Sequence, residues 1–278
     1  MDSPSISSRL KTGYSDLDHL LNGGLPEKYT VVLTCPSSDE RNVIISKFLE
    51  TGLKENQVTF YITSNIEPAT KYADKSQTLF YLFVCNPRVD VITPNLPNVY
   101  RLKGVENLTE IDITLTRAYR TLDSTQNSPR RVCIEILSDV LLQHHSVITR
   151  KWLSGILADL KNNGFTTLAV IDPNMHPAEE VQAIIGLFEG EIQVSENETT
   201  KGIRKTMRIR KMYTQKYDEN EILLTREKVT IDICAMCSKQ IKDQPLLLII
   251  DNKEYRFDTP ECIQTFKKFK SLYGNTFP

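Results

Sequence analysis

Short apolar runs and longer amphipathic stretches take turns along this chain. The runs, such as VVLT and VTFYIT, are typical of strands buried on both faces, and the stretches between them carry apolar residues at helical spacing. The predicted strands lie near residues 30–34, 58–63, 80–85, 99–103, 131–136, 167–171, 190–194, 204–212 and 222–225. The predicted helices lie near residues 15–22, 41–53, 108–123, 147–163 and 177–187. This alternation predicts an α/β domain with a mainly parallel sheet flanked by helices.

Two of the predicted helices carry continuous apolar stripes. The stripes consist of Leu108, Ile111, Leu115, Ala118, Tyr119 and Leu122 in one helix, and Trp152, Leu153, Ile156, Leu157 and Leu160 in the other. We interpret both stripes as core-facing rather than as partner surfaces.

The first core strand and the helix after it are joined by a polar turn, in the stretch VVLTCPSSDERNVIISKF at 31–48. Strand, turn and helix form the layout of a Walker A phosphate loop, G-x-x-x-x-G-K-[ST]. Aligned without gaps, the two glycines fall on Cys35 and Glu40, the lysine on Arg41 and the Ser/Thr on Asn42. An ordinary turn between strand and helix would give the same pattern, so this stretch alone leaves both interpretations open.

These four residues change what such a turn can bind. A phosphate cradle needs glycine where backbone amides converge on the anion, and Cys35 and Glu40 both carry a Cβ. Glu40 would also repel a phosphate by roughly 3 kcal/mol per unit charge, at about 5 Å and an effective dielectric near 20. Arg41 does not replace a flexible ammonium, and Asn42 offers Mg²⁺ an amide oxygen instead of a hydroxyl. We therefore predict no bound nucleotide and no hydrolysis.

The sequence around this turn resembles the KaiC/RadA branch of the RecA-like ATPases over about 12–225. The matching entry segment contains Thr12, Gly13, Leu17, Asp18, Leu20, Leu21, Gly23, Gly24 and Pro26. The resemblance implies a RecA-like P-loop core. It also implies that Glu135 replaces the Walker B aspartate, and that Ser64 and Asn65 replace the acidic pair that activates water. In the K-x-R pair that reaches a neighbouring subunit, Lys211 remains and Tyr213 replaces the arginine.

Composition is ordinary for a globular protein, with 278 residues, 40% of them hydrophobic and 25% charged. The longest apolar runs, such as LLLII at 246–250, are too short to span a bilayer, and the N-terminus lacks the apolar segment of a secretory signal. Cys35, Cys85 and Cys133 lie in apolar surroundings, which favours buried thiols in a reducing cytoplasm. We expect a cytoplasmic protein with no membrane segment.

The stretch KGIRKTMRIRKMYTQK at 201–216 carries seven basic residues and no acidic one. Met207 and Ile209 alternate with Arg208 and Arg210, as in a half-buried strand or hairpin. A subunit or nucleic-acid contact is one interpretation of this strand. The other is a solvated edge strand that its charges protect against aggregation.

Beyond a polar bridge near 215–230, the segment 233–269 has a different character. It resembles the small treble-clef modules of the TRASH/YHS type, in a CxxC, hairpin and YxF pattern that matches Cys234, Cys237, Tyr255, Phe257, Cys262 and Phe266. Asp258 stands where that pattern has its third cysteine. We predict a zinc site of Cys234, Cys237, Asp258 and Cys262, since an Asp oxygen is an accepted zinc ligand. Three cysteines with a water, a copper(I) site, a metal-free module and a redox CxxC are the alternatives.

The predicted domains are therefore a disordered lead at 1–11, a RecA/KaiC-like core at 12–228 and a metal-binding module at 229–278. Because four parts of one site depart together from the family pattern, we expect a pseudo-ATPase rather than an enzyme, acting as a regulatory or scaffold protein in signalling or assembly. The alternatives are an unconventional ATPase using Arg41 and Glu135, a nucleic-acid-binding protein and a metal-sensing regulator. A protein partner or a homo-oligomer is expected. The resemblance implies an archaeal-like signalling component.

Overall fold

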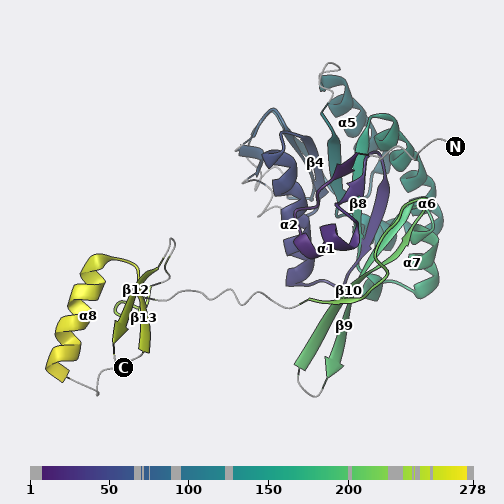
Figure 1. The fold of residues 1–278 in the computed structure, drawn as a ribbon. Helices are drawn as coiled ribbons and strands as arrows, with labels where there is room; N and C mark the ends of the chain where they lie inside the picture. The colour runs from purple at the N-terminus through teal and green to yellow at the C-terminus, as the bar shows by residue number, and fades with distance from the viewer. Residues whose placement is uncertain are drawn as a thin grey trace. The chain divides into compact units, whose positions relative to one another are not determined.

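The computed structural model describes residues 8–65, 70, 72–74, 76–88, 95–122, 128–199, 202–224, 234–239, 241, 245–250 and 253–273. The chain divides into two compact units, Met1–Leu224 and Thr225–Pro278, which are described separately (Figure 1). The boundary expected from the sequence, at 228–229, lies outside the described residues.

A nine-stranded sheet in the order β11-β10-β9-β3-β8-β7-β4-β5-β6 forms the centre of the first unit. The strands are β3 (Thr30–Thr34), β4 (Val58–Thr63), β5 (Phe80–Cys85), β6 (Val99–Leu102), β7 (Arg130–Ile134), β8 (Phe165–Ile171), β9 (Gly190–Thr199), β10 (Gly202–Met212) and β11 (Ile222–Leu223). All strands from β9 to β6 pair in parallel, and β10 and β11 are antiparallel. The predicted α/β fold with a mainly parallel sheet is confirmed.

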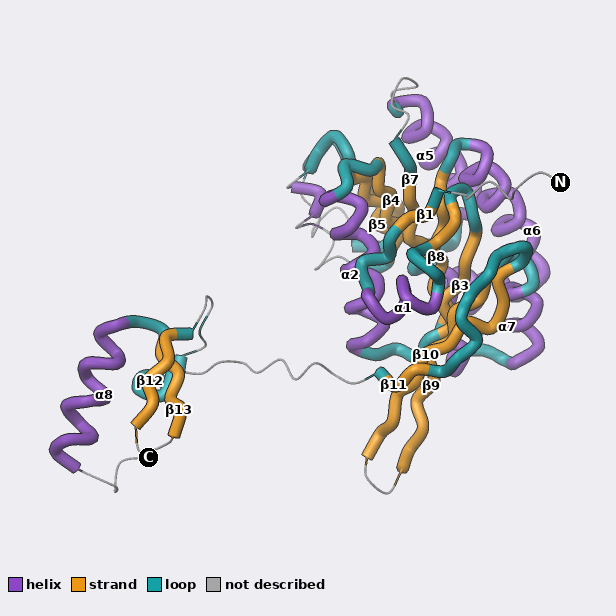
Figure 2. Tube along the Cα trace, in the orientation of Figure 1, coloured by secondary structure: helices purple, strands orange, loops and turns teal. Residues whose placement is uncertain are grey.

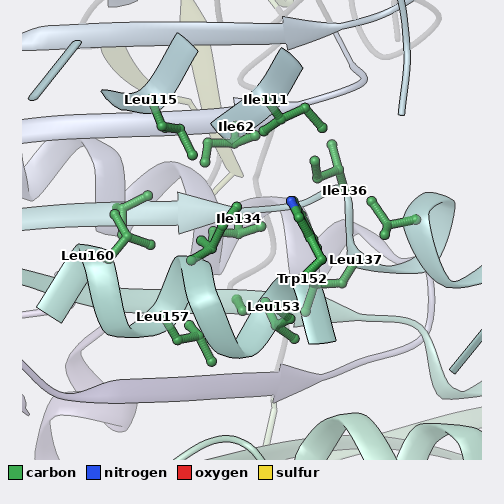
Figure 3. Close-up of a cluster of buried hydrophobic side chains, with 14 of the residues drawn as sticks. Ile62, Ile111, Leu115, Ile134, Ile136, Leu137, Trp152, Leu153, Leu157 and Leu160 are labelled. Carbon is green, nitrogen blue, oxygen red and sulfur yellow. The ribbon is translucent and has the colours of Figure 1, made fainter. Parts of the chain in front are cut away.

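Helices cover both faces of this sheet (Figure 2). They are α1 (Ser15–Leu20), α2 (Asp39–Lys54), α5 (Leu108–Thr121), α6 (Leu137–Asn162) and α7 (Ala178–Ile185), with a short 3₁₀ turn, η1, at Pro173–Met175. Buried residues of α1 and α2 form one hydrophobic core with the sheet, and those of α5, α6 and α7 form the other. Figure 3 shows the second core, where Trp152 and Leu153 of α6 pack near Ile134 of β7. The two apolar stripes therefore face the core, as predicted.

Helix α6 begins at Leu137, ten residues before the helix expected at 147–163. It consists of two helical segments joined by a kink, and the expected helix corresponds to the second segment. His145 has φ 56° and ψ 173°, outside helical geometry, and two helical segments meet there. His144 contacts the Val105 carbonyl through Nε2 at 2.7 Å, which fixes the segment before the kink.

The expected disordered lead at 1–11 is wrong for residues 8–11. Arg9–Leu10 form strand β1, which pairs with Leu25–Pro26 of β2, and Leu10 is only 1% exposed. The Arg9 guanidinium donates to the carbonyl oxygens of Leu21 and Gly24 at 2.7 and 2.9 Å. A two-residue strand has no periodicity that a sequence could show. Residues 1–7 lie outside the described residues.

Strand β10 contains most of the basic stretch and forms a long hairpin with β9. Met207 and Ile209 are buried, which confirms the half-buried strand. The pairing shifts register between Ile209 and Lys211, so the alternation breaks there, and Met212 is buried although continued alternation would turn it outward.

The second unit contains a hairpin of β12 (Leu246–Ile250) and β13 (Lys253–Phe257), followed by helix α8 (Pro260–Tyr273). Tyr255, Phe257 and Phe266 form its small core with Cys234 and Ile241. No helix in the described part of the chain is long and apolar enough to cross a membrane.

Candidate functional site

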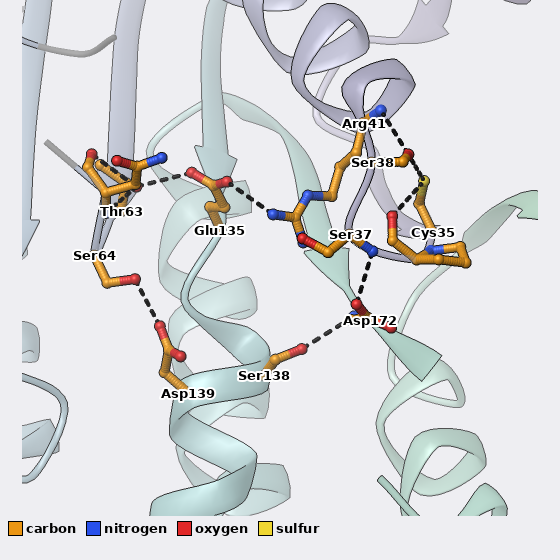
Figure 4. A network of polar contacts seen from close by, with 12 residues as sticks. Cys35, Ser37, Ser38, Arg41, Thr63, Ser64, Glu135, Ser138, Asp139 and Asp172 are labelled. Atoms are coloured by element: carbon orange, nitrogen blue, oxygen red, sulfur yellow. Dashed lines mark hydrogen bonds and ion pairs between the residues drawn. The ribbon is translucent and has the colours of Figure 1, made fainter. Parts of the chain in front are cut away.

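The turn at 35–38 lies at the carboxyl end of the sheet, between β3 and α2 (Figure 4). Because β3, β8, β7 and β4 are parallel neighbours, the residues that follow them converge at this edge. Asp172 follows β8, Glu135 follows β7 and Ser64 follows β4. Open α/β sheets bind their ligands at such an edge, so this is the place to look for function in the first unit.

The turn itself has no left-handed backbone, since none of residues 35–40 has a positive φ. Cys35 is buried and donates its amide to the Ile171 carbonyl at 3.1 Å, and burial raises the pKa of its thiol to about 11. Ser38 is the N-cap of α2 and accepts a hydrogen bond from the Arg41 amide at 3.4 Å. The turn is therefore an ordinary capped helix start rather than a glycine cradle.

An internal carboxylate binds this turn. Asp172 Oδ2 accepts from the Ser37 amide at 2.8 Å, and its Oδ1 accepts from the Asn174 amide at 3.0 Å. The Asp172 amide in turn donates to Ser138 Oγ at 3.0 Å. Asp172 is buried. Our sequence prediction did not include it, although its position at the end of the buried strand LAVI was a usable signal.

Arg41 points toward the sheet and forms an ion pair with Glu135, with Arg41 Nη2 and Glu135 Oε1 3.9 Å apart. The same carboxylate accepts hydrogen bonds from the Tyr61 hydroxyl and, at 2.8 Å, from Thr63 Oγ1. Burial and the Glu135 charge raise the pKa of Tyr61 well above its ordinary value, so it remains a donor. The structure thus brings together the two residues predicted to replace the family's lysine and aspartate.

Glu40, by contrast, is directed to the β9–β10 hairpin. It is 8% exposed in the first turn of α2, where the helix dipole favours an acid, and it pairs with Lys205 of β10. Lys205 also pairs with Glu196 of β9 at 2.9 Å. The charge expected to face a phosphate is therefore neutralised by a lysine that sequence reasoning did not assign to the site.

The remaining predicted residues lie around this centre or away from it. Asn42 lines a cavity of about 160 Å³ together with Tyr61, Asn65 and Glu135. Ser64 donates to Asp139 Oδ2 of α6 at 2.7 Å.

Lys211 contacts Ile185 and Tyr213 of its own chain rather than the turn at 35–38. Its ammonium donates to the Ile185 carbonyl at 3.1 Å and lies 5.1 Å from the centre of the Tyr213 ring. In the sheet, Lys211 lies opposite Glu191 of β9, and Glu191 lies opposite Val32 of β3 on its other side. Val32 is two residues before β3 ends at Thr34.

The second unit holds a separate cluster. The thiols of Cys234, Cys237 and Cys262 and a carboxylate oxygen of Asp258 all lie within 4.8 Å of one another. Ligand atoms around a tetrahedral zinc lie about 3.5–3.8 Å apart, given Zn–S and Zn–O distances of about 2.3 and 2.1 Å. The cluster is slightly wider than a closed site, and all four predicted ligands belong to it.

Asp258 shows that these residues fit a cation. Its Oδ1 is buried and has no hydrogen-bond partner among the described residues, while Oδ2 is 3.4 Å from Cys237 Sγ. The thiols of Cys234 and Cys262 beside it lower the pKa of its carboxyl to about 2, so the carboxylate is ionised. An ionised oxygen that lacks a donor, with three sulfurs around it, is a donor set that zinc accepts.

Comparison with known proteins identifies the first unit. The sequence pattern of the KaiC ATPase family matches residues 10–236. This chain belongs to the KaiC family. Its structure is similar to a KaiC-like protein of the hyperthermophilic archaeon Pyrococcus horikoshii, with a TM-score of 0.59 and 18% identity, covering 90% of this chain and 99% of that one. At that identity the likeness shows the fold alone, which is RecA-like. No match was found among proteins with curated descriptions.

Proposed function

We propose that this KaiC-family chain is a pseudo-ATPase, a regulatory or scaffold component that does not hydrolyse nucleotide and that carries a zinc-binding module. The family is defined by an ATPase domain, so the proposal rests on what occupies the phosphate turn here. The observation that carries it is that internal carboxylates already bind the groups a triphosphate would need.

Two of those groups are the Ser37 amide and the Arg41 guanidinium. Asp172 accepts from the amide, and Glu135 is paired with the guanidinium. A nucleotide would have to displace both carboxylates, and the displaced Asp172 is buried, so losing its hydrogen bonds carries a desolvation cost of about 1–3 kcal/mol. It would also face the charge of Asp139 nearby. The protein's own carboxylates therefore compete with a polyanion for this site.

Catalysis lacks a base at the expected place. Ser64 and Asn65 follow β4, where the family's acidic pair would lie, and neither titrates near neutral pH. Ser64 instead donates its hydroxyl to Asp139. Even if a nucleotide bound, the residues at this position would not activate a water.

The test is calorimetric titration of the full chain with MgATP and with ADP, together with a turnover assay. No binding at micromolar concentration and no phosphate release are expected. Micromolar binding with turnover would overturn the proposal. A variant that restores the motif, Cys35→Gly with Glu40→Gly, Arg41→Lys and Asn42→Ser, should gain binding, whereas Asn42→Ser alone, the matched control, should not.

An unconventional ATPase is the second candidate, and one observation favours it. Arg41 and Glu135 are in contact where the family has its lysine and Walker B acid, and Asp139 adds a carboxylate beside Ser64. This candidate predicts turnover that Arg41→Ala abolishes. Absence of turnover at every nucleotide and metal concentration tried would dismiss it.

Nucleic-acid binding by the basic strand receives less support from the hairpin. Lys205 is paired with Glu40 and Glu196, and Arg208 donates through Nε to Gln193 at 2.9 Å. A strand that offers its charges to phosphates would hold them apart from internal acids. A gel shift at low salt, falling steeply as salt rises, would restore this interpretation.

In the second unit we propose that zinc occupies Cys234, Cys237, Asp258 and Cys262 as a structural ion. The core of this unit is small, and units of this size are commonly stabilised by a metal. A metal-sensing role is the alternative. It predicts reversible exchange in the folded protein, whereas a structural ion leaves only when the module unfolds.

A further inference from the structure

The open edge of β12 in the second unit is the feature that the proposed function leaves unexplained. Among the residues that the structure describes, β12 pairs with β13 alone. The other side of β13 is already in use, because the Arg256 carbonyl accepts from the Ala235 amide at 2.8 Å. The backbone groups on the outer side of β12 have no bond to another described residue. An open strand edge is a template for another strand.

The side chains of this edge are unusual for a surface. The strand reads LLLII and has no charge, proline or glycine, the residues that proteins use to protect an open edge. Leu248 and Ile250 pack against the core of the unit. Leu247 and Ile249 face outward and are 58% and 69% exposed.

Beside them, on the outward face of β13, the partners are polar. Leu247 lies opposite Arg256 and Ile249 opposite Glu254, and these two charged residues form an ion pair at 3.1 Å. The outward face of the hairpin is therefore divided. Its apolar half borders the open edge, and its charged half lies away from that edge.

We propose that this edge pairs with the same edge of a second copy of the chain, in an antiparallel sheet of four strands. A two-fold axis at Leu248 would place Leu246 opposite Ile250 and Leu247 opposite Ile249 of the other copy. Residues opposite one another in an antiparallel pair share a face, so the outward leucine and isoleucine of each copy become neighbours. The charged residues of the two β13 strands form the rims. An apolar centre with polar rims is the anatomy of a protein interface.

A second copy suits this edge better than the other strands of the chain do. The large sheet ends in β6, which contains Arg101, and in the two-residue β11, which pairs with only Thr206 and Met207 of β10 and leaves the segments that hold the five basic residues of β10 outside that pairing. Opposite LLLII they would bring charged groups beside leucines. Two copies of the strand LLLII bring no charged side chain together. A two-fold dimer uses the same surface on both copies, so that surface must complement itself, and this strand does.

The size of the edge sets the expected strength. A five-residue strand buries less than the about 1,600 Å² of a standard interface, so we expect a weak, reversible dimer. The inference concerns the second unit alone and does not depend on whether nucleotide binds to the first. Failure of either proposal leaves the other intact.

The test uses the full chain, purified with its metal, in sedimentation equilibrium over a range of concentration. The native chain should dimerise, and Ile249→Lys should weaken the dimer at least tenfold, because a lysine then faces Leu247 of the other copy. The matched control is Leu272→Lys on α8, an equally exposed apolar site in the same unit, 74% exposed, which should leave the dimer unchanged. Leu247→Thr with Ile249→Thr, which adds no charge, should also weaken it.

Hydrogen exchange locates the contact. Amides of 246–250 should become more protected as the chain concentration rises, and Ile249→Lys should remove that dependence. A chain that stays monomeric at millimolar concentration overturns the proposal and leaves a foreign strand as the occupant. A dimer that survives Ile249→Lys, or that Leu272→Lys weakens as much, overturns it as well.

Discussion

Arg41 and Glu135 are in contact at the carboxyl end of the sheet, with Nη2 and Oε1 3.9 Å apart, although ninety-four positions separate them in the sequence. In an ATPase of this fold, a cation and an acid at these places would share a nucleotide and its metal. Here the Glu135 carboxylate also accepts from Tyr61 and Thr63, so it is held by three groups of the protein itself. The pair is better explained as a structural element that closes the turn.

If Glu135 is structural, its removal should destabilise the protein. Glu135→Ala leaves the buried Tyr61 hydroxyl without its acceptor and Arg41 without its counter-ion, so we expect the free energy of unfolding to fall by about 2–4 kcal/mol. Glu135→Gln keeps an acceptor oxygen and should lose less. Urea denaturation measures both. An alanine variant as stable as the native chain, or more stable, would instead indicate a strained functional carboxylate.

The hairpin should depend on the Glu40–Lys205 pair. Lys205→Met removes a cation that contacts both Glu40 and Glu196, and we expect a loss of about 1–3 kcal/mol. In a double-mutant cycle with Glu40→Gln, the coupling energy should be on the order of 1 kcal/mol. Lys216→Met, at an exposed site on the following segment, is the control. Additive effects of the two substitutions would show that the pair contributes nothing.

The sequence predicted the sheet well because its strands are buried on both faces. A run such as VTFYIT at 58–63 is short and rich in β-branched and aromatic residues, which favours a strand of a covered parallel sheet, and β4 has those same bounds. What it missed depends on contacts far apart in the chain. Lys205 was placed on a basic strand, but its partner Glu40 is 165 positions away, and no local pattern links them.

Other misses have local causes. The kink at His145 hid the first part of α6, because the apolar spacing of a helix shifts where the backbone leaves helical geometry. Asp172 was overlooked since a single acid after a strand is common, and only the fold shows that its carboxylate reaches the Ser37 amide. By contrast, the Cys234-x2-Cys237 spacing is visible without knowledge of the fold, and the resemblance to the treble-clef pattern adds Asp258 and Cys262, which the structure places in the same cluster.

A buried arginine should be among the strongest stabilising residues of the first unit. Arg131 is 0% exposed, donates to Gln57 and to the carbonyl oxygens of Phe48 and Lys11, and stacks over the Phe48 ring. Arg131→Met keeps most of the volume but leaves these acceptors unsatisfied, so we expect a loss of about 3–5 kcal/mol. Arg120→Met, at an exposed site, should change stability by less than about 0.5 kcal/mol. Thermal unfolding would compare them, and equal effects would contradict the prediction.

Acid should destabilise the first unit partly through His176. Burial lowers the pKa of this imidazole below its ordinary value of 6.5, although Glu180, Asp172 and Asp139 oppose the shift. A lowered pKa means that the fold favours the neutral ring, so its contribution is present above pH 6.5 and is lost as pH falls below it. Unfolding free energies from pH 7.5 to pH 5 should fall less steeply for His176→Asn than for the native chain. His19→Asn, at an exposed site, is the matched control, and identical slopes for all three would refute the assignment.

The proposed zinc site of Cys234, Cys237, Asp258 and Cys262 gives the clearest separation between the two units. We expect one zinc per purified chain by elemental analysis, lost in Cys262→Ala, because three remaining ligands hold zinc far more weakly than four. Asp258→Cys should keep the zinc, since it completes a four-cysteine site. Cys35→Ala, which removes a buried thiol of the first unit, should leave the zinc content unchanged.

Chelation of the native chain should abolish slow hydrogen exchange in β13 and α8 while β3 and β8 stay protected, because metal binding and folding are coupled only in the second unit. Zinc retained by Cys262→Ala, or a second unit still protected after chelation, would mean that its apolar core alone holds this module together.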